Sequence, residues 1–378
     1  MKVCLVYDCL FPHTVGGAER WYRNLAERLA RDGHEVTYLT LRQWDRGEGP
    51  GVSGVDVRAV GPRLELYTEG RRRILPPLVF GAGVLAHLLL RGRRYDVVHT
   101  ASFPYFSLLA AALARPLHRF SVVVDWHEVW TRSYWREYLG RAGRVGAFVQ
   151  RLCARVRQRA FCFSRLHAER LRDEGLRGEA TVLEGEYEGE LGRPTPEPAA
   201  RKVVFAGRHI PEKRVPALVE AVALARERLP ELRCDIYGDG PERAEVERLI
   251  ARLGVGDAVR SHGFVDSDEV QAALARALCV VLPSVREGYG MVVVEASSKG
   301  VPSVVARAPD NAASELVEDG ANGYLADSPA PTDLARAIER VEAAGPGLRE
   351  RTADWFEANG RRLSLSESLE TVLRSYRR

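Results

Sequence analysis

The stretch KVVFAGRHIPEKRVPALVEAVALARERLPELRCDIYGDG, residues 202–240, decides the fold class. It opens with an apolar run over residues 202–206 and closes with a second apolar run over residues 233–237. Between them, the pattern over about 215–228 is typical of a helix. Strand-length apolar runs that alternate with helices predict a parallel sheet with helices on both faces.

The same alternation extends in both directions. Toward the C-terminus it predicts helices at 242–252 and 268–276, and strands at 259–261, 278–282 and 303–306. Toward the N-terminus it predicts strands at 2–7, 34–39, 95–99 and 120–125, and a helix that ends near Asp32 before Gly33. The chain is therefore expected to be an α/β protein with two Rossmann-like, doubly wound domains in tandem.

Residues 184–202 are rich in Glu, Gly and Pro, which predicts a linker. We expect an N-terminal domain over 1–190 and a C-terminal domain over 200–360, with an interdomain cleft as the default site. The remaining segment, 361–378, looks helical and can pack back on the first domain.

Composition narrows the class of protein. A length of 378 residues with 46% hydrophobic and 28% charged residues fits two folded domains and disfavours disorder. Six cysteines without a close CxxC pair favour a reduced, cytosolic protein over a disulfide framework or a zinc site. The N-terminal apolar run is too short for a signal peptide.

Residues 74–90 are the one membrane candidate in the sequence. A spanning helix needs about 20 apolar residues, and this segment of 17 contains Pro76, Pro77 and His87. We expect a core-packed helix, with shallow attachment to a membrane face as the intermediate alternative.

Positive charge is concentrated in the first half of the chain. Residues 1–190 contain 29 Lys and Arg against 22 Asp and Glu, and residues 115–165 contain 11 Arg against three acids. Such a region attracts phosphates, nucleic acid or an anionic membrane surface. Nucleic acid is the less favoured partner, because the aromatic residues near Trp126 and Trp130 do not form a known reader module.

The chemistry is most clearly indicated by residues 286–296, REGYGMVVVEA, in which Glu287 and Glu295 lie eight positions apart. A glycine-containing loop that turns into a helix N-terminus offers backbone N–H donors to a phosphate. Carboxylates suit the hydroxyl groups of a sugar. The segment therefore predicts a nucleotide-sugar site.

Arg208 and Lys213 follow the first strand of the second domain. At that edge of a parallel sheet, two cations could neutralise a leaving diphosphate. The alternative is solvated surface charge.

Weaker signals follow other strands. Gly16 and Gly17 leave room for a ligand or form a plain turn, as does Gly-Asp-Gly at 238–240. The backbone near Val265 could meet a base. His127 is either a sugar ligand, an acid/base group or a structural histidine.

Residues 266–268 spell Asp-Ser-Asp directly before a predicted helix. The spacing matches a metal motif of another sugar-transfer fold. An N-cap role for Ser267 or Asp268 is the simpler interpretation.

Together, and in this order along the chain, these motifs resemble family 4 of the retaining glycosyltransferases, which have the GT-B architecture. The resemblance covers nearly the whole chain, and the Glu-x7-Glu segment is its specific part. It implies that Glu295 binds the ribose and that Glu287 and His127 lie at the donor sugar. It also implies further donor contacts, with Arg208 and Lys213 on the diphosphate and with Gly16, Gly17, Gly288, Tyr289, Gly290 and Met291 beside the sugar and diphosphate.

The resemblance also implies a reaction. Family members retain the anomeric configuration, usually need no metal, and are thought to react by front-face displacement, so we expect no cofactor. The sequence departs from the family at Glu128, where Asp is common, and at Thr100, where a histidine is common, which leaves the acceptor open.

We therefore expect a metal-independent transferase that moves a sugar from a nucleotide-sugar donor to a saccharide, a lipid-linked or another cell-envelope acceptor. Its basic first domain suggests peripheral contact with a membrane, so we expect a cytoplasmic enzyme at the inner face of the plasma membrane. A sugar-nucleotide epimerase or phosphorylase of the same fold and a non-catalytic nucleotide-sugar-binding protein are the alternatives.

Overall fold

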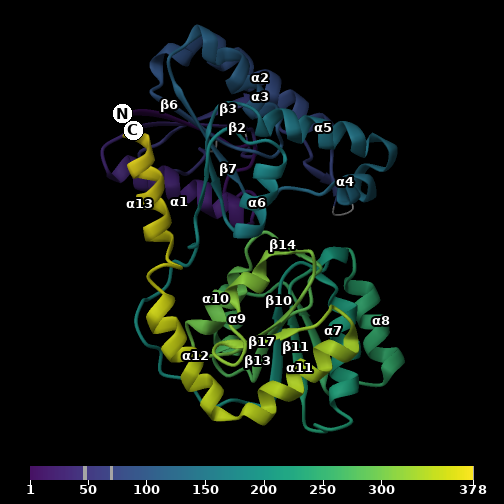
Figure 1. Cartoon of the computed structure of the whole chain (residues 1–378). Coiled ribbons are helices and arrows are strands. Elements are labelled where there is room, and N and C mark those ends of the chain that lie inside the picture. The colour runs from purple at the N-terminus through teal and green to yellow at the C-terminus, as the bar shows by residue number, and fades with distance from the viewer. Residues whose placement is uncertain (46–48, 69–70, 378) are drawn as a thin grey trace. The chain divides into compact units, whose positions relative to one another are not determined.

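The chain folds into two compact units, each built on a parallel β-sheet (Figure 1). The computed structural model describes residues 1–45, 49–68 and 71–377. The first unit contains Met1–Leu183 and Leu369–Arg378, and the second contains Glu184–Ser368. The boundary in the chain thus lies earlier than the expected residue 190, and the C-terminal tail belongs to the first unit.

The first unit has a seven-stranded sheet in the order β3-β2-β1-β6-β7-β8-β9, and every neighbouring pair is parallel. The six strands from β3 to β8 follow the Rossmann order 3-2-1-4-5-6, and β9 extends it. The strands are β1 (Lys2–Val6), β2 (Glu35–Leu41), β3 (Asp56–Gly61), β6 (Val97–Ala101), β7 (Ser121–Trp126), β8 (Arg159–Cys162) and β9 (Ala180–Val182), and β4 (Tyr67–Thr68) and β5 (Arg71–Arg72) form a separate antiparallel pair.

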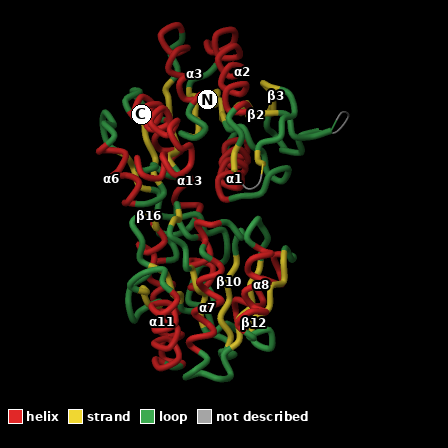
Figure 2. The backbone as a smooth tube through the Cα atoms, turned by 90° about the vertical axis from the view of Figure 1, so that its right-hand side faces the viewer, coloured by secondary structure: helices red, strands yellow, loops and turns green. Residues whose placement is uncertain are grey.

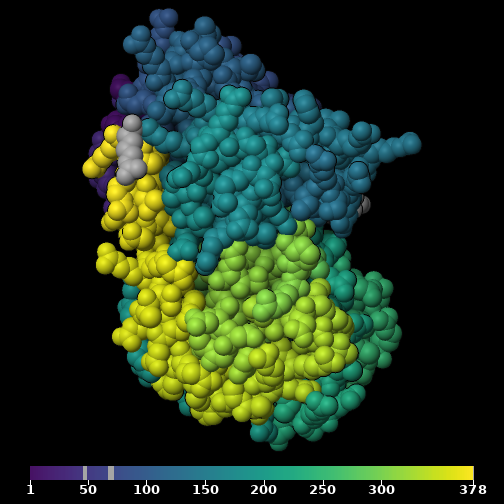
Figure 3. Space-filling view, in the orientation of Figure 1, coloured from purple at the N-terminus to yellow at the C-terminus, as the bar shows by residue number. Residues whose placement is uncertain are grey.

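Helices connect these parallel strands. They are α1 (Gly17–Arg31), α2 (Leu75–Arg91), α3 (Phe106–Ala114), α4 (Arg132–Leu139), α5 (Gly143–Ala154) and α6 (Arg165–Asp173). The last helix, α13 (Leu365–Tyr376), belongs to this unit from Leu369 onward, and its end lies along the surface of the unit (Figure 3).

Helix α2 contains the membrane candidate of the sequence. With the turn that follows it, Leu75–Arg94 is the one described helix that is long and apolar enough to cross a membrane by length and composition. Pro76, Pro77, Phe80 and Val84 on this helix are buried, and the helix packs against α3. Only 39% of the apolar window is buried, however, and Leu89 and Leu90 are 44% and 85% exposed, so one face of the helix packs on the unit and the expectation of a core-packed helix is met only in part.

The second unit repeats the plan with six strands in the order β12-β11-β10-β13-β15-β17. This is again the Rossmann order, and every neighbouring pair is parallel. The strands are β10 (Lys202–Ala206), β11 (Arg233–Tyr237), β12 (Val259–Gly263), β13 (Cys279–Leu282), β15 (Ser303–Ala306) and β17 (Gly323–Ala326), and β14 (Arg286–Glu287) pairs with β16 (Asp310–Asn311) in a short parallel ribbon.

The helices of the second unit cover both faces of its sheet. They are α7 (Val215–Ala225), α8 (Arg243–Leu253), α9 (Ser267–Ala275), α10 (Met291–Ser297), α11 (Pro331–Ala344) and α12 (Pro346–Asn359), with a 3₁₀ turn η4 at Pro211–Lys213. Figure 2 shows α7, α8 and α11 in front of the strands.

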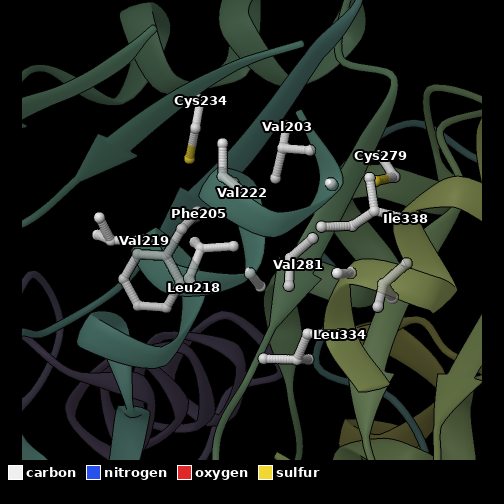
Figure 4. Close-up of a cluster of buried hydrophobic side chains, with 14 of the residues drawn as sticks. Val203, Phe205, Leu218, Val219, Val222, Cys234, Cys279, Val281, Leu334 and Ile338 are labelled. Carbon is white, nitrogen blue, oxygen red and sulfur yellow. The ribbon is translucent and has the colours of Figure 1, made fainter. Parts of the chain in front are cut away.

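Alternate strand residues enter the two halves of this core, because successive side chains of a strand point to opposite faces. Val203 and Val281 pack with α7 and α11 in the large cluster of Figure 4. Their neighbours Val204 and Val280 pack on the other face, with residues of α9 and α10. The apolar runs of the sequence are therefore strands that are buried on both sides.

One local prediction is wrong. Neither Ser267 nor Asp268 caps α9, because the N-cap residue is Asp266 and its side chain makes no capping hydrogen bond. Ser267 and Asp268 instead form the first turn of the helix, where a carboxylate is favoured by the helix dipole.

The predicted linker makes hydrogen bonds to the second unit near both of its ends. Gly185 donates its N–H to Ser368 Oγ at 3.2 Å, and Ala200 donates to the carbonyl of Arg276 at 2.8 Å. Both ends of this Pro-rich segment are therefore anchored to the second unit.

Candidate active site

In the second unit, the predicted motifs meet where the strand order reverses. Strand β10 has β11 on one side and β13 on the other, so the loops that leave β10 and β13 diverge to opposite faces of the sheet. The loop 207–213 follows β10, and the segment 283–290 follows β13. A backbone hydrogen bond from Val285 N to Glu212 O, 2.9 Å long, joins them.

The centre of this site is an ion pair. Lys213 Nζ lies 2.5 Å from Glu287 Oε1, and the same oxygen accepts a hydrogen bond of 2.7 Å from Ser284 Oγ. Both charged side chains are largely buried, with Glu287 only 8% exposed. Charge-assisted contacts of this kind fix the ammonium group in position. Arg208, by contrast, is exposed and has no side-chain partner among the described residues.

The side chain of Asn311 fixes the segment that follows β13. Its buried side chain donates to the carbonyls of Ser284 at 2.9 Å and of Ala306 at 2.8 Å, and its Oδ1 accepts from Ala313 N at 3.1 Å. Strand pairing also places Asn311 opposite Glu287. Neither Asn311 nor Ser284 was expected from the sequence, because neither lies in a motif and their roles depend on contacts between distant segments.

The glycine turn before α10 has little room for side chains. Gly290 has a φ of 107°, and a Cβ there would lie 2.5 Å from the Cβ of Ala313. Both the conformation and the close approach therefore require glycine. Tyr289 is nearly buried, and its hydroxyl donates to the carbonyl of Glu184 at 2.6 Å.

The remaining predicted residues of this segment are only partly exposed. Gly288 precedes the turn, and Met291 and Glu295 lie on α10, all three half-buried. The structure thus places Lys213, Glu287 and the 288–291 turn at one edge of the sheet. It places Glu295 one helical turn further along α10 than Met291.

The turn after β11 packs against the loop after β10. Gly207 N donates to Tyr237 O at 3.1 Å, and His209 N donates to Asp239 O at 2.9 Å. Gly238 makes this approach possible, since a Cβ there would collide with the carbonyl of Gly207. The Gly-Asp-Gly sequence therefore has a clear structural role.

The segment after β12 turns its two apolar residues in different directions. Val265 is partly buried and packs against the cluster that contains Tyr237 and Leu274. Phe264 is 80% exposed. A contact between a base and Val265 could therefore use only the backbone and stays a prediction.

In the first unit, Gly16 caps α1 and Gly17 begins it. A Cβ on Gly16 would meet the carboxylate of Glu19, the end of a flexible side chain that would have to move, whereas one on Gly17 would meet nothing within 4 Å among the described residues. Gly17 thus leaves an open position. Glu19 is buried, and burial raises the pKa of its carboxyl group.

Behind this turn, Asp8 follows β1 and forms a buried ion pair with Arg72. The guanidinium of Arg72 also lies over the ring of Phe103, 5.1 Å from its centre. The sequence offered one signal for this pair, an acid placed directly after a buried strand.

His127 lies just after β7 in an aromatic environment. Its ring stacks on Phe163 with centroids 4.4 Å apart and meets Tyr22 edge-on at 6.4 Å. Its Nε2 is buried and has no hydrogen-bond partner within the described parts of the chain. A buried nitrogen without a partner is costly unless a ligand or water satisfies it.

Beside it, His99 and Asp125 form a fully buried pair. His99 Nε2 lies 2.9 Å from Asp125 Oδ1, and Trp21 Nε1 donates to Asp125 Oδ2 at 2.7 Å. His99 Nδ1 bonds to the hydroxyl of Tyr376 on α13. Burial acts to raise the pKa of Asp125, but the charge and hydrogen bond of His99 hold it below its usual value.

His127 should make stability fall in mild acid. Burial lowers the pKa of His127, although Asp125 and Glu128 act against this shift. Below about pH 6.5 the unfolded chain therefore takes up this proton before the folded chain does, and folding is disfavoured. We expect the Tm of His127→Gln to fall less steeply than that of wild type between about pH 6.5 and 5.

A thermal-melt series over this pH range measures the difference. The control is His13→Gln, which makes the same substitution at an exposed histidine. Parallel slopes for His127→Gln and wild type would show that His127 titrates alike in both states.

No group of three or more His, Cys, Asp or Glu side chains suited to a metal occurs in residues 1–45, 49–68 and 71–377. The six cysteines are all buried and unpaired. Burial raises the pKa of Cys162 to about 12, so this thiol stays protonated at neutral pH.

Two family models match the chain in succession. "Glycosyl transferase 4-like domain" matches residues 16–184, and "Glycosyl transferases group 1" matches residues 193–360. The chain belongs to the family 4-like glycosyltransferases. This agrees with the resemblance seen in the sequence.

The chain is also similar to individual glycosyltransferases, and it spans about two fifths or less of the first curated relatives that it matches. Alpha-D-kanosaminyltransferase of Streptomyces kanamyceticus is 34% identical over 152 residues, which is 40% of this chain and 39% of that protein. MMP alpha-(1->4)-mannosyltransferase of Mycolicibacterium hassiacum is 28% identical and aligns with 92% of this chain and 90% of its own length.

Solved structures show the same fold. HepE from Anabaena, in complex with UDP, has a TM-score of 0.75 at 20% identity and is covered over 99% of both chains. The fold class expected from the sequence, GT-B with two Rossmann-like domains, is therefore confirmed.

Proposed function

We propose that this family member transfers a sugar from a nucleotide-diphosphate-sugar to a saccharide, lipid-linked or other cell-envelope acceptor, with retention of configuration and without a metal. The observation that carries the proposal is the buried Lys213–Glu287 pair beside the glycine turn before α10. It puts a fixed cation and a carboxylate at the sheet edge where ligands of such folds bind.

Lys213 is suited to a leaving diphosphate. An ammonium group has three donors, so Nζ can keep its contact with Glu287 and still donate to a phosphate oxygen. Arg208, exposed in the same loop, can supply a second cation. Stabilisation of charge that develops on a leaving group lowers the barrier to transfer.

The other predicted residues are likewise each assigned to one part of the donor. We assign the donor sugar to Glu287 and the ribose to Glu295, with the backbone of 288–291 at the sugar and diphosphate. In the first unit, the open position at Gly17 leaves room for a ligand, and His127 Nε2 can bond to a sugar hydroxyl.

Retention fits the side chains around Glu287. Its carboxylate is engaged by Lys213 and Ser284, an arrangement that suits positioning rather than nucleophilic attack. Front-face displacement, in which the departing phosphate oxygen takes the proton of the acceptor, needs no protein nucleophile. The two cations offer charge neutralisation without a metal.

A thermal-shift screen of nucleotide-sugars tests donor binding. A donor that binds only the native state at 100 times its Kd should stabilise it by about 2.7 kcal/mol, which raises the Tm. No shift with any nucleotide or nucleotide-sugar would contradict the proposal. The donor found in this way is then incubated with candidate acceptors in EDTA, and the anomeric configuration of the product is read by NMR.

The same assay separates the alternatives. Conversion of the donor sugar without an acceptor would indicate an epimerase, and phosphate-dependent cleavage would indicate a phosphorylase. Binding without conversion under any acceptor would indicate a nucleotide-sugar-binding protein. An inverted product, or activity lost in EDTA and restored by Mg²⁺, would refute the corresponding part of the proposal.

A further inference from the structure

Helix α5 in the first unit presents large apolar side chains to solvent. Val145, Phe148 and Leu152 are 63%, 66% and 46% exposed. Their spacing of three and four residues places them on one face of the helix, which we call the α5 stripe. Apolar residues in an amphipathic surface helix normally face the core, whereas these three residues of α5 face solvent.

The exposure of the α5 stripe is not the result of a loosely packed helix. Gln150, on the opposite face, is fully buried and accepts hydrogen bonds from Tyr105 Oη at 3.0 Å and from Trp130 N at 2.9 Å. A Cβ on Gly146 would collide with the ring of Trp135 on α4, so the two neighbouring helices pack closely (Figure 1). The orientation of α5 is therefore fixed.

Positive charge borders the α5 stripe. Residues 138–168 contain seven arginines and no Asp or Glu. Arg144 and Arg155 lie four residues before Phe148 and three after Leu152, which puts both on the same side of the helix as the stripe. Both are exposed, and neither has an ion-pair partner within the described residues. Arg151 differs, because it pairs with Glu174 at 3.0 Å.

We infer that α5 attaches the protein to an anionic lipid surface. Val145, Phe148 and Leu152 would enter the boundary between headgroups and acyl chains, while Arg144 and Arg155 contact lipid phosphates. A short apolar face bordered by arginines is the pattern of a helix that lies in the membrane interface. A second copy of the chain is a poorer occupant, since a two-fold contact would bring the arginines of both copies together.

This attachment does not depend on sugar transfer, because lipid binding needs neither donor nor acceptor. It deepens the proposed function in one respect. A surface-bound first unit would meet a lipid-linked acceptor in the plane in which that acceptor lies.

Co-sedimentation of the full chain with vesicles tests the inference. Phosphatidylcholine vesicles that contain phosphatidylglycerol should bind the protein, and pure phosphatidylcholine vesicles should bind it much less. The triple variant Val145→Ser, Phe148→Ser, Leu152→Ser should reduce binding at least about tenfold, since three apolar side chains leave the bilayer. Arg144→Gln with Arg155→Gln should weaken it further, by roughly fivefold per arginine.

The control replaces exposed residues of the same types on α8 of the second unit, Arg252→Gln with Leu253→Ser, and should bind like wild type. Unchanged melting temperatures show that each variant is folded. Equal binding of wild type to both kinds of vesicle, or full binding by the folded triple variant, would overturn the inference. So would a dimer of the wild-type chain in solution that Phe148→Ser dissociates, because a second copy would then occupy the stripe.

Discussion

Replacing Lys213 by alanine should lower kcat for sugar transfer by about 10²- to 10³-fold, the usual effect of removing one donor that stabilises transition-state charge. Lys213 Nζ is held by Glu287 in a largely buried site, so it does not have to be ordered when charge develops on the diphosphate. The same change should alter KM much less, since the leaving-group charge grows only in the transition state.

Two companion variants separate catalysis from packing. Lys213→Arg keeps the charge but not the compact point donor, so it should recover only part of the activity. Glu295→Ala should weaken donor binding and leave kcat largely intact if Glu295 holds the ribose.

Loss of its partner also leaves the Glu287 carboxylate largely buried with Ser284 as its remaining side-chain contact. Lys213→Ala should therefore lower the Tm, and Lys213→Ala with Glu287→Gln should regain part of that loss without regaining activity. Equal turnover in wild type and Lys213→Ala would refute the role of Lys213 at the diphosphate. Steady-state kinetics and thermal melts, measured on the same preparations, decide the matter.

Strands buried on both faces were the easiest elements to predict. Strand β10 has the bounds expected from the sequence, because the apolar run after Lys202 ends at Gly207 and both faces of the strand need apolar side chains. The C-terminal segment 361–378 was likewise expected to be helical, and α13 spans Leu365–Tyr376. Its membership of the first unit depends on single contacts such as Tyr376 with His99, which no local pattern encodes.

The predicted site shows the same limit. The glycine turns and the two glutamates could be located from the sequence, because the backbone conformation of a turn restricts its residue types. The hydrogen bonds of Asn311 to Ser284 and Ala306 could not be predicted, since they join segments that meet only in the folded sheet. The Lys213–Glu287 pair was missed for this reason, although both residues were expected at the site.

Replacing Asp125 by alanine should lower the free energy of unfolding by about 3–5 kcal/mol, as removal of one partner from a buried charged pair usually does. Asp125 is completely buried, and it accepts from Trp21 Nε1 while lying against His99 Nε2. Without it, Trp21 Nε1 loses its acceptor and His99 Nε2 loses its ion-pair partner. Its position two residues before His127 means that the loss should also disturb the predicted sugar contact.

Urea unfolding followed by tryptophan fluorescence measures this effect, because Trp21 and Trp126 are both buried in the first unit. Asp125→Asn keeps an acceptor for Trp21 and should cost less than Asp125→Ala. Tyr376→Phe removes only the hydroxyl that bonds to His99 and should cost about 1 kcal/mol, which separates the α13 contact from the buried pair. If Asp125→Ala unfolded at the same urea concentration as wild type, the pair would contribute nothing to stability. The low pKa expected for Asp125 would then need another cause.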